Sequence, residues 1–108
     1  MAYLTYYCLR IESPTPAEHE HALTTLRESS ENAQEALTAD GSPWEWWAWY
    51  EHEDDMRQLS TRFPDMLFIL SGKGEENEDI WVKYFKGGRM QVSYATIILD
   101  KFDERKLS

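Results

Sequence analysis

The chain has one cysteine, no long apolar run and few basic residues, and each scarcity excludes a class of protein. Cys8 has no second thiol with which to form an internal disulfide, which is typical of the reducing cytoplasm. We interpret it as a small core hydrophobe rather than a nucleophile, because no base lies near it in the sequence. No apolar stretch approaches the roughly 20 residues of a membrane span, and the N-terminus does not resemble a signal peptide. We therefore expect a cytoplasmic protein with no membrane partner.

The charge is strongly negative and unevenly distributed. The 108 residues include 20 acids and 11 bases, so the formal net charge is -9. Residues 1–82 hold 17 of the acids and only 5 of the bases. Because nucleic-acid binding requires lysine and arginine to neutralise phosphates, direct binding of DNA or RNA is disfavoured. A negative surface instead favours a partner with a basic surface, although acidity also serves solubility alone.

Tryptophan is concentrated near the middle of the chain. Four of the five tryptophans lie within residues 44–50, where alternation predicts a strand with aromatic side chains on both faces. Two interpretations stay open. The strand belongs to the core, covered by helices, or Trp47 and Trp49 line a contact surface, since indoles are frequent at interface hot spots.

Periodicity and capping signals predict the remaining elements. Thr15, Pro16 and Glu18 form a capping-box start for a helix that we expect to continue to about residue 39. Acids at the start of a second helix interact favourably with its dipole, and Pro64 ends that helix. Gly87-Gly88 predicts a tight hairpin. The predicted strands cover residues 2–11, 44–50, 66–71, 79–86 and 89–100, and the predicted helices cover 15–39 and 51–63.

This order, β-α-β-α-β-β-β, predicts an α+β fold. We expect a single domain over residues 1–108 with a weakly ordered tail at 101–108. The predicted architecture is a ferredoxin-like two-layer sandwich, in which a mostly antiparallel sheet carries both helices on one face.

No motif in the sequence predicts catalysis, a bound metal or a cofactor. His19 and His21 are two residues apart on a helix and point in different directions, so they do not readily share an ion. Gly72-Lys73-Gly74 is too short for a phosphate-binding loop and is followed by acids. We therefore expect a non-enzymatic protein.

Residues 44–100 resemble the ferredoxin-like domain of YubB-type proteins, which phages and plasmids carry. The similarity rests on the following residues: Leu59-Ser60, Phe63-Pro64, Phe68, Leu70, Gly72, Gly74-Glu75-Glu76, Asp79, Trp81, Tyr84-Phe85 and Gly87-Gly88. The Trp-x-Pro-Pro element of that family is absent, because Trp49-Tyr50 enters the helix without proline. The resemblance implies a mobile-element origin and a fold, and it implies no catalytic residue.

Two functions remain open at this stage. In the first, a phage or mobile-element protein binds and inhibits a host nucleic-acid-handling protein, such as a CRISPR effector, by nucleic-acid mimicry; its size and acidity are similar to those of anti-CRISPR inhibitors. The partner-binding residues predicted for this function are Glu51, Glu53, Asp54, Asp55, Glu75, Glu76, Glu78, Asp79, Trp47 and Trp49. In the second, a small-ligand module stacks a nucleotide on tryptophans and holds its charge with bases: Trp46, Trp47, Trp49, Trp81, Lys83, Lys86 and Arg89. The oligomeric state is open in both.

Overall fold

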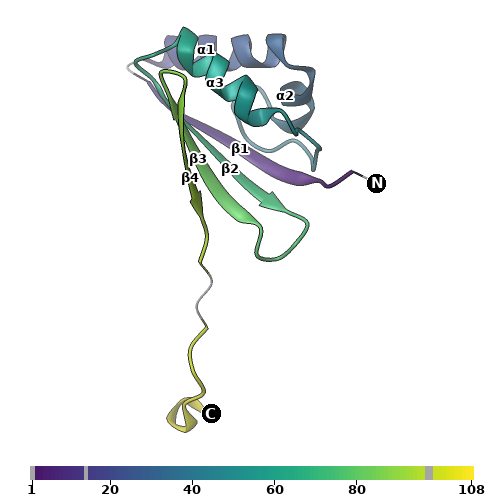
Figure 1. Cartoon of the computed structure of the whole chain (residues 1–108), viewed down its shortest axis with the longest axis vertical. Coiled ribbons are helices and arrows are strands. Elements are labelled where there is room, and N and C mark those ends of the chain that lie inside the picture. The colour runs from purple at the N-terminus through teal and green to yellow at the C-terminus, as the bar shows by residue number, and fades with distance from the viewer. Residues whose placement is uncertain (1, 14, 97–98) are drawn as a thin grey trace.

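The chain forms one antiparallel sheet with helices on one side of it (Figure 1). The structure is a computed structural model that describes residues 2–13, 15–96 and 99–108. Its elements are β1 (Thr5–Glu12), α1 (Pro16–Ser29), α2 (Glu31–Ala36), α3 (His52–Arg62), β2 (Leu67–Gly74), β3 (Ile80–Lys86), β4 (Arg89–Tyr94) and a short 3-10 helix, η1 (Glu104–Lys106). Among the described residues, every helix is too short or too polar to traverse a lipid bilayer.

The four strands lie in the sheet in their order along the chain, and every neighbouring pair is antiparallel. The architecture is therefore α+β, as the sequence predicts, with one helical layer and one sheet layer. Strict alternation along β1 directs Tyr7, Leu9 and Ile11 into the core and Tyr6, Cys8 and Arg10 to the open face. Cys8 is exposed, so its interpretation as a core hydrophobe is wrong.

The core lies between the sheet and the helices. Its largest fully buried side chains include Trp49, Phe68 and Phe85, together with Leu23 and Leu26 from α1. Helix α3 contributes Met56 and Leu59 from a single face, which matches the helical period of those positions. This packing fixes the start of α3 above one end of the sheet.

Residues 44–50 do not form the predicted strand. The backbone of this segment pairs with β1 through an isolated bridge between Thr5 and Trp47 and not as a continuous strand, and Trp49 then enters the core between the layers. A split β-α-β unit requires two parallel strands, whereas all strand pairs here are antiparallel and sequential. The predicted element order and the first half of the ferredoxin-like topology therefore need correction.

The long first helix is also interrupted, at Ser30. The backbone of Ser30 is extended, and its hydroxyl accepts a hydrogen bond from the Ala33 N–H, so it caps α2. At the other end of the chain, β4 ends at Tyr94 rather than near residue 100, and Ile97 and Ile98 lie outside the described residues. Bulky side chains on both faces of a strand are typical of a central strand, but β1 is an outer strand of this sheet.

Three glycines, at two places in the fold, are required by local geometry. Gly87 and Gly88 have φ values of +57° and +81°, as a tight hairpin turn with the twist of its strands requires. Gly72 lies beneath the indole of Trp81, and a Cβ at residue 72 would lie 2.2 Å from a ring carbon of that indole. Trp81 can therefore lie flat against β2 only because residue 72 has no side chain.

Candidate functional site

The structure brings the two predicted groups of acids to the same end of the molecule, and Tyr3 links them. The Tyr3 N–H donates to the Tyr50 hydroxyl at 2.9 Å, just before α3 begins. The Tyr3 hydroxyl donates to Asp79 Oδ2 at 2.6 Å and accepts from the Glu76 N–H at 3.3 Å. The bond to Asp79 raises the pKa of the Tyr3 phenol. The start of α3 and the turn between β2 and β3 thus lie on the same side in Figure 1.

We call this region the acidic end and define it by its solvent-exposed or half-exposed acids outside the core: Glu51, Glu53, Asp54, Glu75, Glu76 and Glu78. Of these, only Glu53 forms an ion pair within the part of the chain that the structure describes. In the described part of the chain, the other members present their negative charge to solvent and form no ion pair with a lysine or arginine. This is the arrangement that a basic partner surface would recognise.

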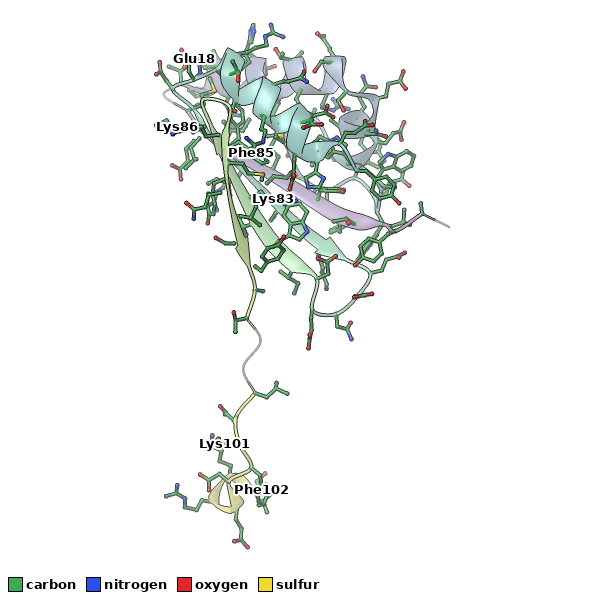
Figure 2. All side chains as sticks on the ribbon, viewed as in Figure 1. Glu18, Lys83, Phe85, Lys86, Lys101 and Phe102 are labelled. Atoms are coloured by element: carbon green, nitrogen blue, oxygen red, sulfur yellow. The ribbon has the colours of Figure 1, made fainter. Side chains whose placement is uncertain are left out.

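Beneath the acidic end lies a buried cation, Lys83. It is only 7% exposed, and it lies on the side of the sheet that α3 covers (Figure 2). Its Nζ is 2.8 Å from Glu53 Oε2, 2.7 Å from His52 Nε2 and 4.2 Å from the centre of the Trp81 ring. A buried charge needs such partners, because desolvation of an unpaired ammonium is very unfavourable.

His52 connects this cation to the core. Its ring is stacked on Trp81, with centroids 5.1 Å apart and an interplanar angle of 13°. Nδ1 lies 2.8 Å from the Trp49 carbonyl oxygen and donates to it, so Nε2 is free to accept from Lys83. Burial, and then the charge of Lys83, lower the pKa of His52. The hydrogen bond from Lys83 lowers the pKa of Glu53. At neutral pH, both shifts favour a neutral His52 beside an ionised Glu53.

Asp55 has a structural role that distinguishes it from the other predicted acids. Its Oδ2 accepts hydrogen bonds from the Trp49 indole N–H at 2.7 Å and from the Ser30 hydroxyl at 2.9 Å. One carboxylate oxygen thereby joins α3, the α2 cap and the buried tryptophan. Asp79 is likewise engaged, by Tyr3. We therefore separate Asp55 and Asp79 from the acids that are available to a partner.

The aromatic part of the prediction needs a correction. Trp49 is 0% exposed, because its indole fills the space between the layers, and it cannot anchor a partner. Trp47 is half-buried, and its indole N–H donates to Asn32 Oδ1 at 3.1 Å. The exposed aromatic side chains of this segment are Trp44, Trp46 and Tyr50. Trp46 packs beside Tyr6 with a centroid distance of 5.4 Å, close to the strand end that carries Tyr3.

Sequence reasoning missed Lys83 and Tyr3 as parts of this region. The alternation of β3 already placed residue 83 on the same face as Trp81 and Phe85, and a lysine in a row of core positions is a detectable signal of a buried ion pair. Tyr3 gave no such signal, because its partners are 47 and 76 residues away in the sequence.

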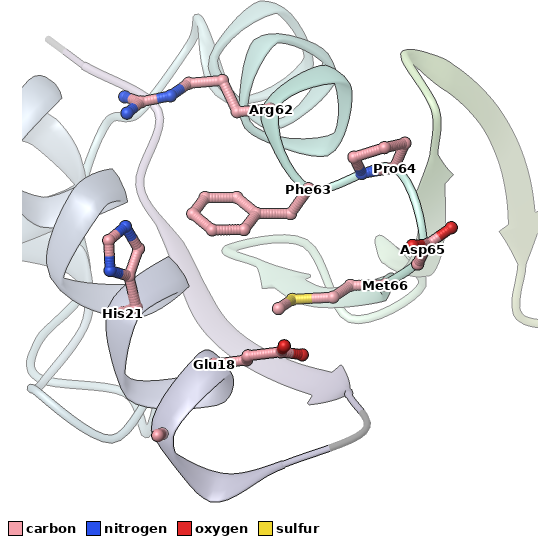
Figure 3. A pocket seen from close by; sticks show the side chains of 8 residues that line it. Glu18, His21, Arg62, Phe63, Pro64, Asp65 and Met66 are labelled. Atoms are coloured by element: carbon pink, nitrogen blue, oxygen red, sulfur yellow. The ribbon is translucent and has the colours of Figure 1, made fainter.

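A separate pocket of about 500 Å³ lies at the opposite end of the sheet, between the start of α1 and the end of α3 (Figure 3). The ring of Phe63 meets His21 edge to face at 5.3 Å, and Met66 forms part of the apolar lining. Glu18, Arg62 and Asp65 surround it with charges of both signs. This pocket shares no residue with the acidic end.

No set of three or more histidine, cysteine or acidic side chains in residues 2–13, 15–96 and 99–108 is arranged to hold a metal ion. Comparison with protein-family models, with curated proteins and with solved structures gives no match. The resemblance to YubB-type proteins and the anti-CRISPR analogy therefore stay predictions, and the functional argument depends on the geometry alone.

Proposed function

We propose that this chain is a non-enzymatic binding protein whose acidic end docks on a basic surface of a nucleic-acid-handling protein and so competes with nucleic acid for it. The observation that carries the proposal is the convergence of two acid groups, far apart in the sequence, around Tyr3. Glu51 and Asp54 come from the start of α3, and Glu75, Glu76 and Glu78 come from the β2–β3 turn.

Buried contacts hold the α3 part of this surface, which favours binding. Lys83, His52, Trp81 and Asp55 hold the start of α3 through buried contacts. Charges fixed before binding lose little conformational entropy when a partner docks, so preorganised acids bind more tightly than mobile ones. The surface thus presents negative charge at defined positions, as a nucleic-acid backbone does.

Exposed aromatic side chains border the acids and provide apolar contact. Tyr50 is 65% exposed and immediately precedes Glu51, and Trp46 lies near the same strand end. Aromatic anchors surrounded by charge are typical of protein interfaces. They replace Trp47 and Trp49 in the proposal.

The nucleotide-binding alternative has less support. Trp49 and Trp81 are buried, and one face of Trp81 already stacks on His52. Lys83 is engaged with Glu53 and His52 and is not available to a phosphate. Lys86 and Arg89 flank the β3–β4 hairpin turn, at the other end of β3 from Ile80 and the acidic turn. The tryptophans and the bases of that interpretation therefore do not form one open site.

Charge reversal with a matched control tests the proposal. The variant Glu75→Lys, Glu76→Lys, Glu78→Lys removes charge at the acidic end. The control, Glu12→Lys, Glu20→Lys, Asp65→Lys, changes the net charge equally at exposed positions at the other end. Each form is used to capture partners from lysate of the natural host, where we expect the protein to act in the cytoplasm. Captured proteins are identified by mass spectrometry.

The captured partner is then purified, and its affinity for the chain and for its own nucleic acid is measured at two salt concentrations. We expect the native chain and the control to displace nucleic acid, and the acidic-end variant to bind at least about 10-fold more weakly with a smaller salt dependence. Equal binding by all three forms would contradict the proposal. So would a partner that binds the chain and nucleic acid simultaneously.

A further inference from the structure

The two outer strands of the sheet differ in whether the backbone N–H and C=O groups on their outer edges are hydrogen-bonded. On β1, the N–H of Thr5 donates to the Trp47 carbonyl at 2.9 Å, and the N–H of Trp47 donates to the Thr5 carbonyl at 2.9 Å. The Leu9 N–H donates to the Gly41 carbonyl at 2.8 Å. The segment between α2 and α3 thus covers this edge, which prevents another strand from pairing there.

The opposite edge, on β4, is not covered in this way. The hairpin pairs Lys86 with Arg89, and the Ala95 N–H donates to the Ile80 carbonyl at 2.9 Å. Antiparallel alternation then directs the N–H and C=O groups of Met90, Val92 and Tyr94 away from β3. Within the described part of the chain, no backbone hydrogen bond satisfies these outward groups.

The β4 edge also lacks the features that keep outer strands apart. Residues 90–96 contain no charged residue, proline or glycine. Native edge strands are commonly protected by lysine, proline, bulges or a covering segment. The helix-facing side chains of β4 are incompletely covered, since Met90 and Val92 are half-buried and Tyr94 is 72% exposed. The strand therefore offers both a hydrogen-bonding edge and an apolar strip.

We propose that this edge pairs with β4 of a second copy of the chain to form a two-fold antiparallel dimer with one continuous sheet. The register is centred on Val92, which lies opposite Val92 of the second copy, while Met90 lies opposite Tyr94. Each of these pairs exchanges two backbone hydrogen bonds, because all three residues direct their N–H and C=O groups outward. Arg89 then faces Ala95 rather than Arg89 of the second copy, so no like charges meet.

The charge distribution favours a second copy as the occupant. In the antiparallel arrangement, the acidic end of one copy lies on the same side of the joined sheet as the hairpin of the other copy. That hairpin carries Lys86 and Arg89. The two acidic ends lie at opposite sides, which keeps their like charges apart. A general strand-donating partner would gain the backbone bonds but not this complementarity.

The pairing closes at two copies. A two-fold interface uses the same edge of both molecules, and the covered β1 edge gives no place for a third. Since edge pairing buries less surface than a standard interface, we expect dissociation in the micromolar range. The inference does not depend on the proposed function, because β4 is outside the acidic end.

The mass of the full chain, measured by light scattering over a concentration series, tests the dimer. We expect the mass to rise from 12.8 kDa toward twice that value. Val92→Pro removes the outward N–H at the centre of the interface without removing a bond to β3, and should weaken association about 100-fold. Tyr94→Lys, at an exposed side chain, should also weaken it and provides a second variant if Val92→Pro misfolds. Circular dichroism checks the fold of each variant.

The register has its own test in a Cys8→Ser background. Gln91 lies opposite Ser93 of the second copy, in a close pair without backbone hydrogen bonds. Mixing Gln91→Cys chains with Ser93→Cys chains under mild oxidation should therefore give a crosslinked heterodimer faster than either variant forms a crosslink alone. A mass of 12.8 kDa at every concentration would overturn the dimer. If Val92→Pro and Tyr94→Lys fold and associate as the native chain does, the proposed β4 interface is wrong. Equal crosslinking of all mixtures would also contradict it.

Discussion

The neighbouring carboxylates of residues 53–55 differ in whether they are bonded within the chain or exposed to solvent. Asp55 is held by a tryptophan N–H and a serine hydroxyl, and the half-exposed Glu53 pairs with a buried lysine. Asp54 lies between them in the sequence and remains exposed, as do Glu75 and Glu76 in the neighbouring turn. The difference shows that an acid-rich stretch is not one functional unit. Its inner members form hydrogen bonds or an ion pair within the chain, and its outer members stay exposed to solvent.

The sharpest way to separate the two groups is to remove Asp55. Asp55→Ala leaves the buried indole N–H of Trp49 and the hydroxyl of Ser30 without an acceptor, so we expect a loss of about 2–4 kcal/mol in the free energy of unfolding. Urea denaturation followed by tryptophan fluorescence measures it. Asp54→Ala is the matched control and should change stability by less than about 0.5 kcal/mol. Equal losses of stability in both variants would contradict the structural distinction between Asp55 and Asp54.

The buried lysine allows a second comparison, between charge and packing. Lys83→Ala removes the partner of Glu53 and His52 together with the aliphatic stem beside Trp81, and we expect a loss of about 2 kcal/mol. Lys83→Met keeps an apolar stem of similar length, and the half-exposed Glu53 can turn to water. We therefore expect its stability to stay within about 1 kcal/mol of the native chain. A larger loss in the Met variant than in the Ala variant would contradict this account.

The pH dependence of stability should reveal the inner group through His52. The pKa of His52 lies below its ordinary value of 6.5, so the unfolded chain binds more protons than the folded chain in this range. Stability should therefore fall as the pH falls below about 6.5, by up to about 1.4 kcal/mol for each unit by which the pKa is lowered. Denaturation midpoints between pH 8 and pH 5 measure this dependence.

His52→Gln is the control for that titration, and its midpoint should vary less over the same range. The pKa of Glu53 is lowered from 4.5, so its contribution is present above about that pH and is lost as the pH falls through the folded value. The two groups thus act in different pH windows. A native chain whose stability rises on acidification from pH 7 to pH 5 would show that the His52 assignment is wrong.

The smallest effect on stability is expected for the outer group. Replacing Glu75, Glu76 and Glu78 together by glutamine should leave the free energy of unfolding within about 0.5 kcal/mol, since these side chains are exposed. The same variant should lose affinity for a basic partner. Parallel urea denaturation and binding measurements compare the two outcomes, and a large loss of stability would place these acids in the inner group.

The sequence predicted the elements with a clear period and missed those that depend on distant partners. Alternation in β1 and β3, the N-cap at Thr15 and the Gly87-Gly88 hairpin are confirmed, because they depend mainly on local geometry. The prediction of a strand at residues 44–50 was wrong, because alternation does not show which of the tryptophans is buried in the core. Trp49 is drawn inward by Asp55 and Tyr7, neither of which a local pattern identifies.

The sequence likewise predicted some features of the candidate site and missed others. Charge counting indicated an acidic protein, but it could not distinguish Asp55 from Asp54, since that distinction arises only when Ser30 and Trp49 arrive from other elements. The convergence of the two acid groups required Tyr3, whose hydrogen bonds cross most of the chain. Long-range contacts of this kind have no signature in a single sequence.

The exposed thiol on β1 gives the chain a single site for chemical labelling. Cys8 is the chain's one cysteine and points from the open face of the sheet, away from the helices. A maleimide dye would therefore attach once per chain, at a known strand position that faces away from the helical layer. Energy transfer between differently labelled chains would follow their assembly in real time, and dye anisotropy would follow capture of a partner.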